Sequence, residues 1–180
     1  MQDVLAADAT VHLAATGDGA AFARLVTQHH AAMARVAYVI CGDPELTRDA
    51  VQAAWTIAWR RLRDVKDPAK VQAWLVAVAA NEARQAVRRQ RRSVVVDIST
   101  VAEQPGATDP AESIVVVDLT RALRGLKPDD RSLLALRFVA GLDSTEIAAQ
   151  LGGSASGVRS RLARLIERLR DDLGVQEADR

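Results

Sequence analysis

The chain has 180 residues, 49% of them hydrophobic and only 3% aromatic, which is enough apolar material for one domain or two small ones. Its formal net charge of +1 conceals a strong segregation of acidic and basic residues along the sequence. No uncharged apolar run is long enough to span a bilayer, and the N-terminus lacks the early basic charge of a signal peptide. Cys41 has no second cysteine to pair with, which excludes an internal disulfide and leads us to expect a cytoplasmic protein.

Apolar residues recur every three or four positions in the first half of the chain, which predicts an all-α architecture. After an N-terminal tail at 1–19, a first small helical domain is expected over 20–92. Asp43 and Pro44 give a strong start signal within it, because proline favours the first position of a helix. A charged loop is expected from Asp64 to Lys70. The helices of this domain are expected at Ala20 to Cys41, Asp43 to Arg63 and Pro68 to Arg92.

Residues 93–110 have no helical periodicity and contain a Pro-Gly pair, which predicts a flexible linker between two domains. The linker is acidic, since the stretch from Ser93 to Thr120 has five acidic residues and no basic one. A second small helical domain is expected over 111–173, followed by a C-terminal tail at 174–180. Its first two helices are expected at Ala111 to Gly125 and Pro128 to Val139.

The segment from Asp143 to Arg170 has the pattern of a helix-turn-helix. Asp143 and Glu146 fit a capping box at the start of a short helix, and two adjacent glycines end that helix. Ser154 can cap a second helix, whose apolar face would consist of Val158, Leu162, Leu165 and Leu169. The second helix of such a motif enters the major groove of DNA. A surface helical hairpin with solvated arginines would show the same local pattern.

A second basic cluster ends the first domain, where five arginines fall within the nine residues from Arg84 to Arg92. At 100° per residue, a polar stripe flanks the apolar face of this helix; it consists of Asn81, Arg84, Arg88 and Arg91. Amide and guanidinium groups can bind phosphates and offer hydrogen bonds to base edges. Charge runs at helix ends are also commonly just solvated, so the cluster alone leaves both interpretations open.

The remaining candidates for chemistry point away from an enzyme. The tryptophans, Trp55, Trp59 and Trp74, are expected to pack in the core rather than to stack on unpaired bases. The adjacent histidines and Cys41 lack the spacing of a zinc site, so no metal is expected. The glycine- and serine-rich stretch 152–157 follows a helix and lacks the lysine of a phosphate-binding loop. No nucleophile has a suitable base, so we expect neither a catalytic site nor a cofactor.

Taken in order, these motifs resemble those of a bacterial RNA polymerase sigma factor of the extracytoplasmic-function (ECF) group. The resemblance covers about Ala20 to Leu173. In the first domain it rests on Asp49-Ala50-Val51-Gln52, Trp55, Trp59, Trp74-Leu75, Asn81 and Arg88-Arg89. In the second it rests on Leu126-Lys127-Pro128, Arg131, Leu136-Arg137-Phe138, Gly141-Leu142, Glu146-Ile147-Ala148, Leu151-Gly152 and Val158-Arg159-Ser160-Arg161-Leu162.

The resemblance implies an all-α, two-domain protein without a catalytic site that binds core RNA polymerase and promoter DNA. Asp49 and Gln52 would lie on the surface of the first domain that binds the polymerase clamp helices. The loop that contains Lys66 and Lys70 would hold a flipped-out base of the minus-ten element, at a cost in unstacking that a shaped pocket converts into selectivity. The other minus-ten contacts would come from Asn81, Arg84, Arg88 and Arg91.

The second domain would bind the polymerase flap and read the minus-thirty-five element with its recognition helix. The residues at the DNA-facing positions are Ser154, Arg159, Ser160, Arg161 and Arg164. The acidic linker would suit the basic RNA exit channel of the polymerase. In this family an anti-sigma factor that masks both domains is a frequent further partner.

The chain departs from the family pattern at four places: Arg48, Gln85, Gly153 and Ser156-Gly157. Gly157 costs up to about 1 kcal/mol of helix stability, and the promoter sequence cannot be copied from relatives. Two other functions are weighed against the sigma factor. A regulator that binds an operator unaided would need an effector pocket or dimer heptads, which residues 1–110 do not offer. A helical module that sequesters a protein partner would not need arginines on a recognition helix.

Overall fold

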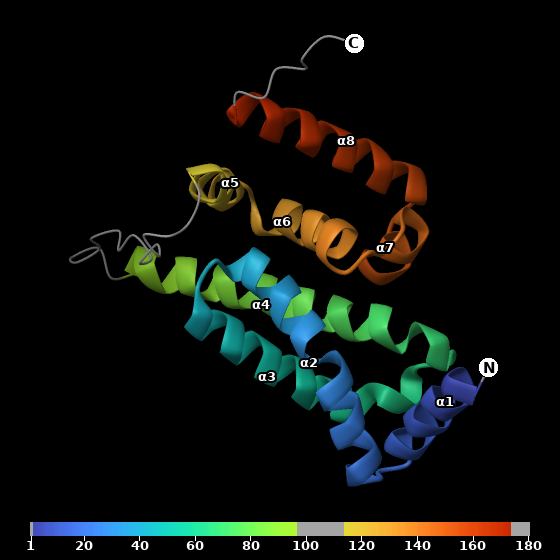
Figure 1. Ribbon diagram of the computed structural model, residues 1–180. Helices are drawn as coiled ribbons and strands as arrows, with labels where there is room; N and C mark the ends of the chain where they lie inside the picture. The colour runs from blue at the N-terminus through green and yellow to red at the C-terminus, as the bar shows by residue number, and fades with distance from the viewer. Residues whose placement is uncertain (1, 97–113, 174–180) are drawn as a thin grey trace.

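The computed structural model describes residues 2–96 and 114–173, and the regular secondary structure of these residues is entirely helical (Figure 1). The predicted all-α class is therefore confirmed. The first group of helices consists of α1 (Gln2–Ala15), α2 (Gly19–Cys41), α3 (Pro44–Arg61), η1 (Leu62–Asp64), η2 (Pro68–Lys70) and α4 (Val71–Val96). The second group consists of α5 (Ile114–Gly125), α6 (Pro128–Leu134), η3 (Ala135–Val139), α7 (Ser144–Leu151) and α8 (Ala155–Asp172). Most of the linker expected at 93–110, and the tail expected at 174–180, lie outside the described residues.

The first domain is a bundle of α2, α3 and α4 around one apolar core. The inward face of α2 carries Met33, Val36 and Ile40, which are fully buried, as their spacing of three and four predicts. Leu75 and Val76 of α4 fill the same core. Each such side chain stabilises the fold by about 1.5–3 kcal/mol relative to an exposed position.

Side chains and one glycine define where α2 and α3 begin and end. Asp18 and Asp43 cap the two helices, and each carboxylate accepts a hydrogen bond of 2.8 Å from the backbone N–H three residues on. Pro44 occupies the first turn of α3, as its position in the sequence predicts. Gly42 ends α2 with a φ of 68°, a left-handed conformation that turns the chain sharply into α3.

The N-terminal segment differs from the expectation. Instead of a tail at 1–19, Gln2–Ala15 form helix α1, which packs against α2 and against η1 and η2. Val11 and Ala14 of this helix are buried in the core of the first domain. The apolar residues of this segment do not gather into one stripe, so periodicity fails to reveal the helix. The last helix of the domain also runs to Val96, beyond the end expected at Arg92.

Helices α5 to α8 form the second domain. Its apolar residues, among them Leu133, Leu136 and Ile147, belong to a cluster that is continuous with the core of the first domain. The helix expected at Pro128 to Val139 is present, but its last turn, η3, is π-helical. In this wide turn the Ala140 N–H donates to the Ala135 carbonyl at 3.0 Å.

Helices α7 and α8 form the predicted helix-turn-helix. Its capping box is confirmed, because Asp143 and Glu146 each accept a 2.8 Å hydrogen bond from the other's backbone N–H. Gly152 and Gly153 link the two helices with φ values of 76° and 125°. Residues with a side chain rarely adopt such angles, so the glycine pair permits the turn. Ser154 caps α8, as expected.

The second domain sits directly on the first. Its segments α6 and η3 lie against α2 and α4, while α8 forms the outer layer, on the side away from α3 (Figure 1). The long helix α4 runs underneath α6 and α7. The face of α4 that carries the arginine stripe is thereby brought next to the second domain.

Candidate nucleic-acid interface

The recognition helix α8 has an apolar face toward its own domain and a polar face toward solvent. Its buried residues are Val158, Leu162 and Leu165. Arg159, Ser160 and Arg164 are exposed on the other side, as predicted. Within the described part of the chain, the side chains of Arg159 and Arg164 have neither a hydrogen-bond partner nor an ion-pair partner. Both guanidinium groups are therefore available to a ligand such as DNA.

Ser154 is exposed, but its hydroxyl is already used by the protein. The Ser154 Oγ accepts the Gly157 N–H at 3.1 Å and lies 3.1 Å from the Ser156 Oγ. A Cβ added at Gly157 would stand 3.2 Å from the Ser154 Oγ, which is a tight contact. The glycine that departs from the family pattern therefore makes room for the helix cap.

Arg161 differs from its neighbours on α8. Its Nε and Nη2 donate to the Oδ1 of Asp130 at 2.9 and 2.6 Å, so the guanidinium is turned toward α6. The Arg161 side chain is still 45% exposed, whereas that of Asp130 is only 14% exposed. An arginine in an ion pair of this geometry has to exchange one acceptor for another before it can contact DNA.

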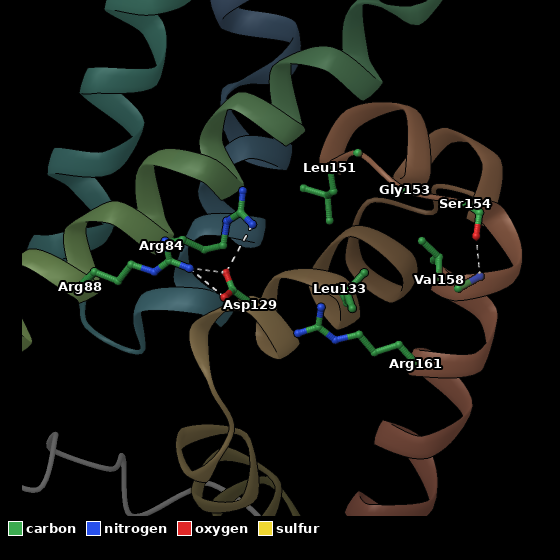
Figure 2. Close-up of a pocket in the computed structure, with 11 residues that line it drawn as sticks. Arg84, Arg88, Asp129, Leu133, Leu151, Gly153, Ser154, Val158 and Arg161 are labelled. Carbon is green, nitrogen blue, oxygen red and sulfur yellow. Dashed lines mark hydrogen bonds and ion pairs between the residues drawn. The ribbon is translucent and has the colours of Figure 1, made fainter.

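The polar stripe predicted on α4 is present, and two of its arginines, Arg84 and Arg88, point toward Asp129 (Figure 2). The Asn81 Oδ1 accepts from Arg84 Nη2 at 3.1 Å, and Arg84 Nη1 lies 3.4 Å from Asp129 Oδ1. Arg88 Nη2 donates to both Asp129 oxygens, at 2.9 and 2.7 Å. Asn81, Arg88 and Arg91 are exposed, and Arg84 is half-buried. The structure thus brings two of the predicted residues of α4, Arg84 and Arg88, onto an acidic side chain of the second domain.

Lys66 and Lys70 lie on the short segment that contains η1 and η2, and both side chains are exposed. Asp67 shapes this segment, because its carboxylate accepts the Ala69 N–H at 3.1 Å. Helix α1 packs against both η1 and η2. The segment is therefore held in place by a helix that the sequence alone does not predict.

Asp49 and Gln52 are exposed on α3, and Gln52 borders an apolar groove of about 550 Å³ between α2 and α3. Trp55 forms part of its wall and donates a hydrogen bond to the His30 ring at 3.3 Å. The Trp55 ring also packs edge-on against Phe22, with ring centroids 5.6 Å apart. Trp55 and Trp74 pack against the core as expected, whereas Trp59 is 47% exposed, so the core position expected for it is wrong.

Two charged residues, Glu82 and Arg131, are buried, which the sequence analysis does not predict. Glu82 on α4 is 7% exposed and accepts hydrogen bonds from its neighbours Asn81 and Gln85, at 3.3 and 2.9 Å. Arg131 on α6 is 4% exposed, and its Nε has no hydrogen-bond partner. Burial, the nearby charge of Arg91 and, less strongly, that of Arg124 lower the pKa of Arg131. Arg131 lies against the C-terminal end of α2 in the other domain, and periodicity along the chain cannot reveal such a contact.

The described residues contain no group of three or more side chains that could hold a metal ion. Burial raises the pKa of the Cys41 thiol to about 11, so this thiol is protonated at neutral pH. In the described part of the chain, no helix combines the length and the apolar character needed to cross a membrane.

Residues 25–93 match Sigma-70 region 2, and residues 117–169 match Sigma-70 region 4. The ECF RNA polymerase sigma factor SigE of Mycolicibacterium smegmatis is 30% identical over 174 residues, which cover 92% of this chain and 67% of that protein. The probable RNA polymerase sigma factor RfaY of Xanthomonas campestris is 30% identical over 168 residues, or 89% of this chain, but the chain spans only 42% of its length. The sigma factor RpoE of Bartonella quintana, solved in complex with the anti-sigma factor NepR, superposes with a TM-score of 0.72 at 23% identity, covering 87% of this chain and 98% of that one.

These matches show that the chain belongs to the Sigma-70 family of bacterial RNA polymerase sigma factors. The order of its two regions and the names of its relatives place it in the ECF group of that family. Proteins of this family act in transcription initiation, together with RNA polymerase and promoter DNA.

Proposed function

We propose that this chain binds core RNA polymerase and directs it to a small set of promoters, by recognising the minus-thirty-five and minus-ten elements and helping to open the latter. The observation that carries this proposal is that one chain has two separate basic helix faces, on α4 and on α8. A regulator that binds an operator unaided needs one such surface, whereas a promoter with two elements needs two. With domains at 20–92 and 111–173, each of the two promoter elements is bound by a domain of its own.

In the first domain, Asn81, Arg84, Arg88 and Arg91 bind the minus-ten strand. Their amide and guanidinium groups suit the phosphates and unpaired bases of a single strand. The segment with Lys66 and Lys70 holds a base that is flipped out of the duplex, and the energy for this step comes from binding.

In the second domain, α8 enters the major groove of the minus-thirty-five element. Arg159 and Arg164 are the candidates for base contacts, because they are exposed and have no partner among the described residues. Ser160 lies beside them. Ser154 and Arg161 contribute contacts at the edge of the site, since both are partly used within the protein.

The groove beside Gln52 is the proposed contact with the clamp helices of the polymerase. An apolar groove of about 550 Å³ bordered by polar side chains suits the apolar face of a partner helix. Replacement of Asp49 and Gln52 by alanine should weaken binding to core polymerase by about 5- to 10-fold, measured by fluorescence anisotropy with labelled chain. Gln72→Ala, an exposed change on α4, is the control; unaltered affinity of the double variant would contradict the assignment.

The same proposal covers location and chemistry. We propose that the protein works in the cytoplasm, where its polymerase is, and that the polymerase catalyses every bond-forming step. An anti-sigma factor is proposed as a further partner. This part of the proposal is supported by the similarity in fold between this chain and a sigma factor that was solved in complex with an anti-sigma factor.

The test is run-off transcription from a library of bacterial promoters by core polymerase, with and without this chain. Specific initiation that depends on the chain is the expected result. Tight binding of the chain alone to one DNA sequence, without any specific initiation, would favour the unaided regulator instead.

A further inference from the structure

The arginines proposed to bind the minus-ten strand are held by a carboxylate of the other domain. Asp129 stands in the first turn of α6, while Arg84 and Arg88 lie on α4, more than forty positions earlier in the chain. Figure 2 shows both arginines pointing toward the Asp129 side chain. Three contacts of 2.7, 2.9 and 3.4 Å join the one carboxylate to the two guanidinium groups.

A carboxylate that accepts N–H bonds from two guanidinium groups resembles a phosphate of a nucleic-acid backbone in charge and in hydrogen-bonding capacity. The same N–H groups of Arg84 and Arg88 cannot serve Asp129 and a phosphate fully at once. The Arg84 side chain is only 19% exposed and that of Asp129 36% exposed, so a strand would also meet the second domain as an obstacle. DNA binding on α4 and the closed arrangement of the domains therefore compete.

The contact between the two domains also includes a residue, Arg131, that destabilises it. Arg131 and Arg124 of the second domain approach the C-terminal end of α2, since a Cβ at Gly42 would lie 3.8 and 3.7 Å from their side chains. A cation at a helix C-terminus is favourable. Arg131, however, is almost completely buried with an unpartnered Nε, and burying a guanidinium group without a carboxylate is costly. The contact is thus held by Asp129 and weakened by Arg131, which suits an interface that has to open.

We infer that the second domain acts as an internal inhibitor of the first, with the Asp129 carboxylate occupying the position of a DNA phosphate on Arg84 and Arg88. This inference rests on the proposed minus-ten role of these two arginines. Polymerase binding, which engages each domain on a separate surface, exchanges the internal carboxylate for the DNA backbone. The free chain consequently binds single-stranded DNA weakly through α4 until the domains separate.

The test compares the full-length chain with Asp129→Asn. The probe is a fluorescein-labelled, random-sequence single-stranded DNA of about twelve nucleotides, because arginine–phosphate contacts do not depend on sequence. Asp129→Asn should bind the probe ~3- to 10-fold more tightly than the parent chain at low salt. Each additional arginine–phosphate pair should steepen the plot of log affinity against log salt by about 0.7, and two arginines should therefore steepen it by up to ~1.4. Small-angle X-ray scattering should show a larger radius of gyration for the variant.

Glu45→Gln is the matched control, because Glu45 follows the N1 proline of α3 just as Asp129 follows that of α6. It removes the same charge at the same helix position without touching the contact between the domains. Asp129→Lys, which repels both arginines, should open the chain further, and circular dichroism checks that each variant is folded. An increase in affinity for Glu45→Gln equal to that for Asp129→Asn, or no increase for either Asp129 variant, would overturn the inference.

A separate measurement distinguishes this inference from the proposed function. Arg88→Ala in the assembled holoenzyme should lower promoter opening, whereas Asp129→Asn should leave holoenzyme run-off unchanged at saturating core polymerase. If Arg88→Ala opens promoters normally, the minus-ten role itself is wrong. If Arg88→Ala fails but Asp129→Asn binds the probe no better than its parent, only the internal inhibition is wrong.

Discussion

Helices α4 and α8 both carry arginines at helical spacing, but they present them differently. On α8, Arg159 and Arg164 face solvent without a partner among the described residues. On α4, Arg84 and Arg88 are paired with Asp129 of the other domain. Two basic surfaces that are similar in sequence thus differ in structure: Arg159 and Arg164 are unpaired within the described part of the chain, whereas Arg84 and Arg88 are held by a carboxylate of the other domain.

The number of arginines on a helix therefore does not show whether their guanidinium groups are free to bind a ligand. A guanidinium group with a carboxylate partner has to break that contact, whereas a solvated one only sheds water. Arg161 shows the point within a single helix, because it shares α8 with Arg159 but is bound to Asp130. Pairing, and not position alone, separates the two surfaces.

The largest effect is expected on folding stability, from a change in the apolar core where the second domain packs on α2 and α4. Leu136 in η3 is fully buried, and η3 packs on α2 and α4. Leu136→Ala should lower the free energy of unfolding by about 2–5 kcal/mol, because it leaves a cavity as well as losing apolar burial. Urea denaturation followed by circular dichroism measures this loss. Leu13→Ala, at a residue 48% exposed, should cost less than about 0.5 kcal/mol, and an equal loss for both would contradict the packing described.

A weaker effect tests the contrast between free and paired arginines on α8 itself. Arg159→Ala should cost about 1–3 kcal/mol of discrimination between promoter sequences, because a free guanidinium can read a base edge. Arg161→Ala should cost less discrimination, since Arg161 already has a partner in Asp130. Holoenzyme binding to a library of minus-thirty-five variants compares the two. A uniform loss on every sequence for Arg159→Ala would mean that it contacts phosphates only.

The smallest effect is expected on the pH dependence of folding stability, and it comes from a histidine of the first domain. Burial lowers the pKa of His29 below its ordinary value of 6.5. Below about pH 6.5 the unfolded chain binds a proton that the folded chain resists, so stability is full above this pH and falls below it, by at most about 1.4 kcal/mol per pH unit. The urea midpoint at pH 7.5 and 5.5 should therefore differ less in His29→Gln than in the parent chain. An equal difference between the two pH values in His29→Gln and in the parent chain would contradict this assignment.

Local sequence signals predict much of this fold. The helices from Gly19 to Arg61, the helix-turn-helix with its capping box, and the outward position of Arg159 and Arg164 all follow from spacing and from capping residues. These features depend on residues within one or two turns of each other, which periodicity can detect.

Features that depend on contacts between residues far apart in the chain could not be predicted from the sequence. The ion pair of Asp129 with Arg84 joins residues 45 positions apart, and buried Arg131 likewise lies against a distant segment, the end of α2. Helix α1 is missed for a different reason, because its apolar positions form no stripe. The roles of the predicted site residues in binding stay predictions.

The π-helical turn η3 has a geometric consequence for the whole second domain. A π-turn uses one residue more than an α-turn, and each residue advances a helix by about 100°. The chain therefore leaves η3 at a different angle from the one that an unbroken α6 would impose on Gly141 and on α7 after it. This extra residue therefore contributes to the direction in which α7 and α8 leave the second domain, from a position outside the helix-turn-helix itself.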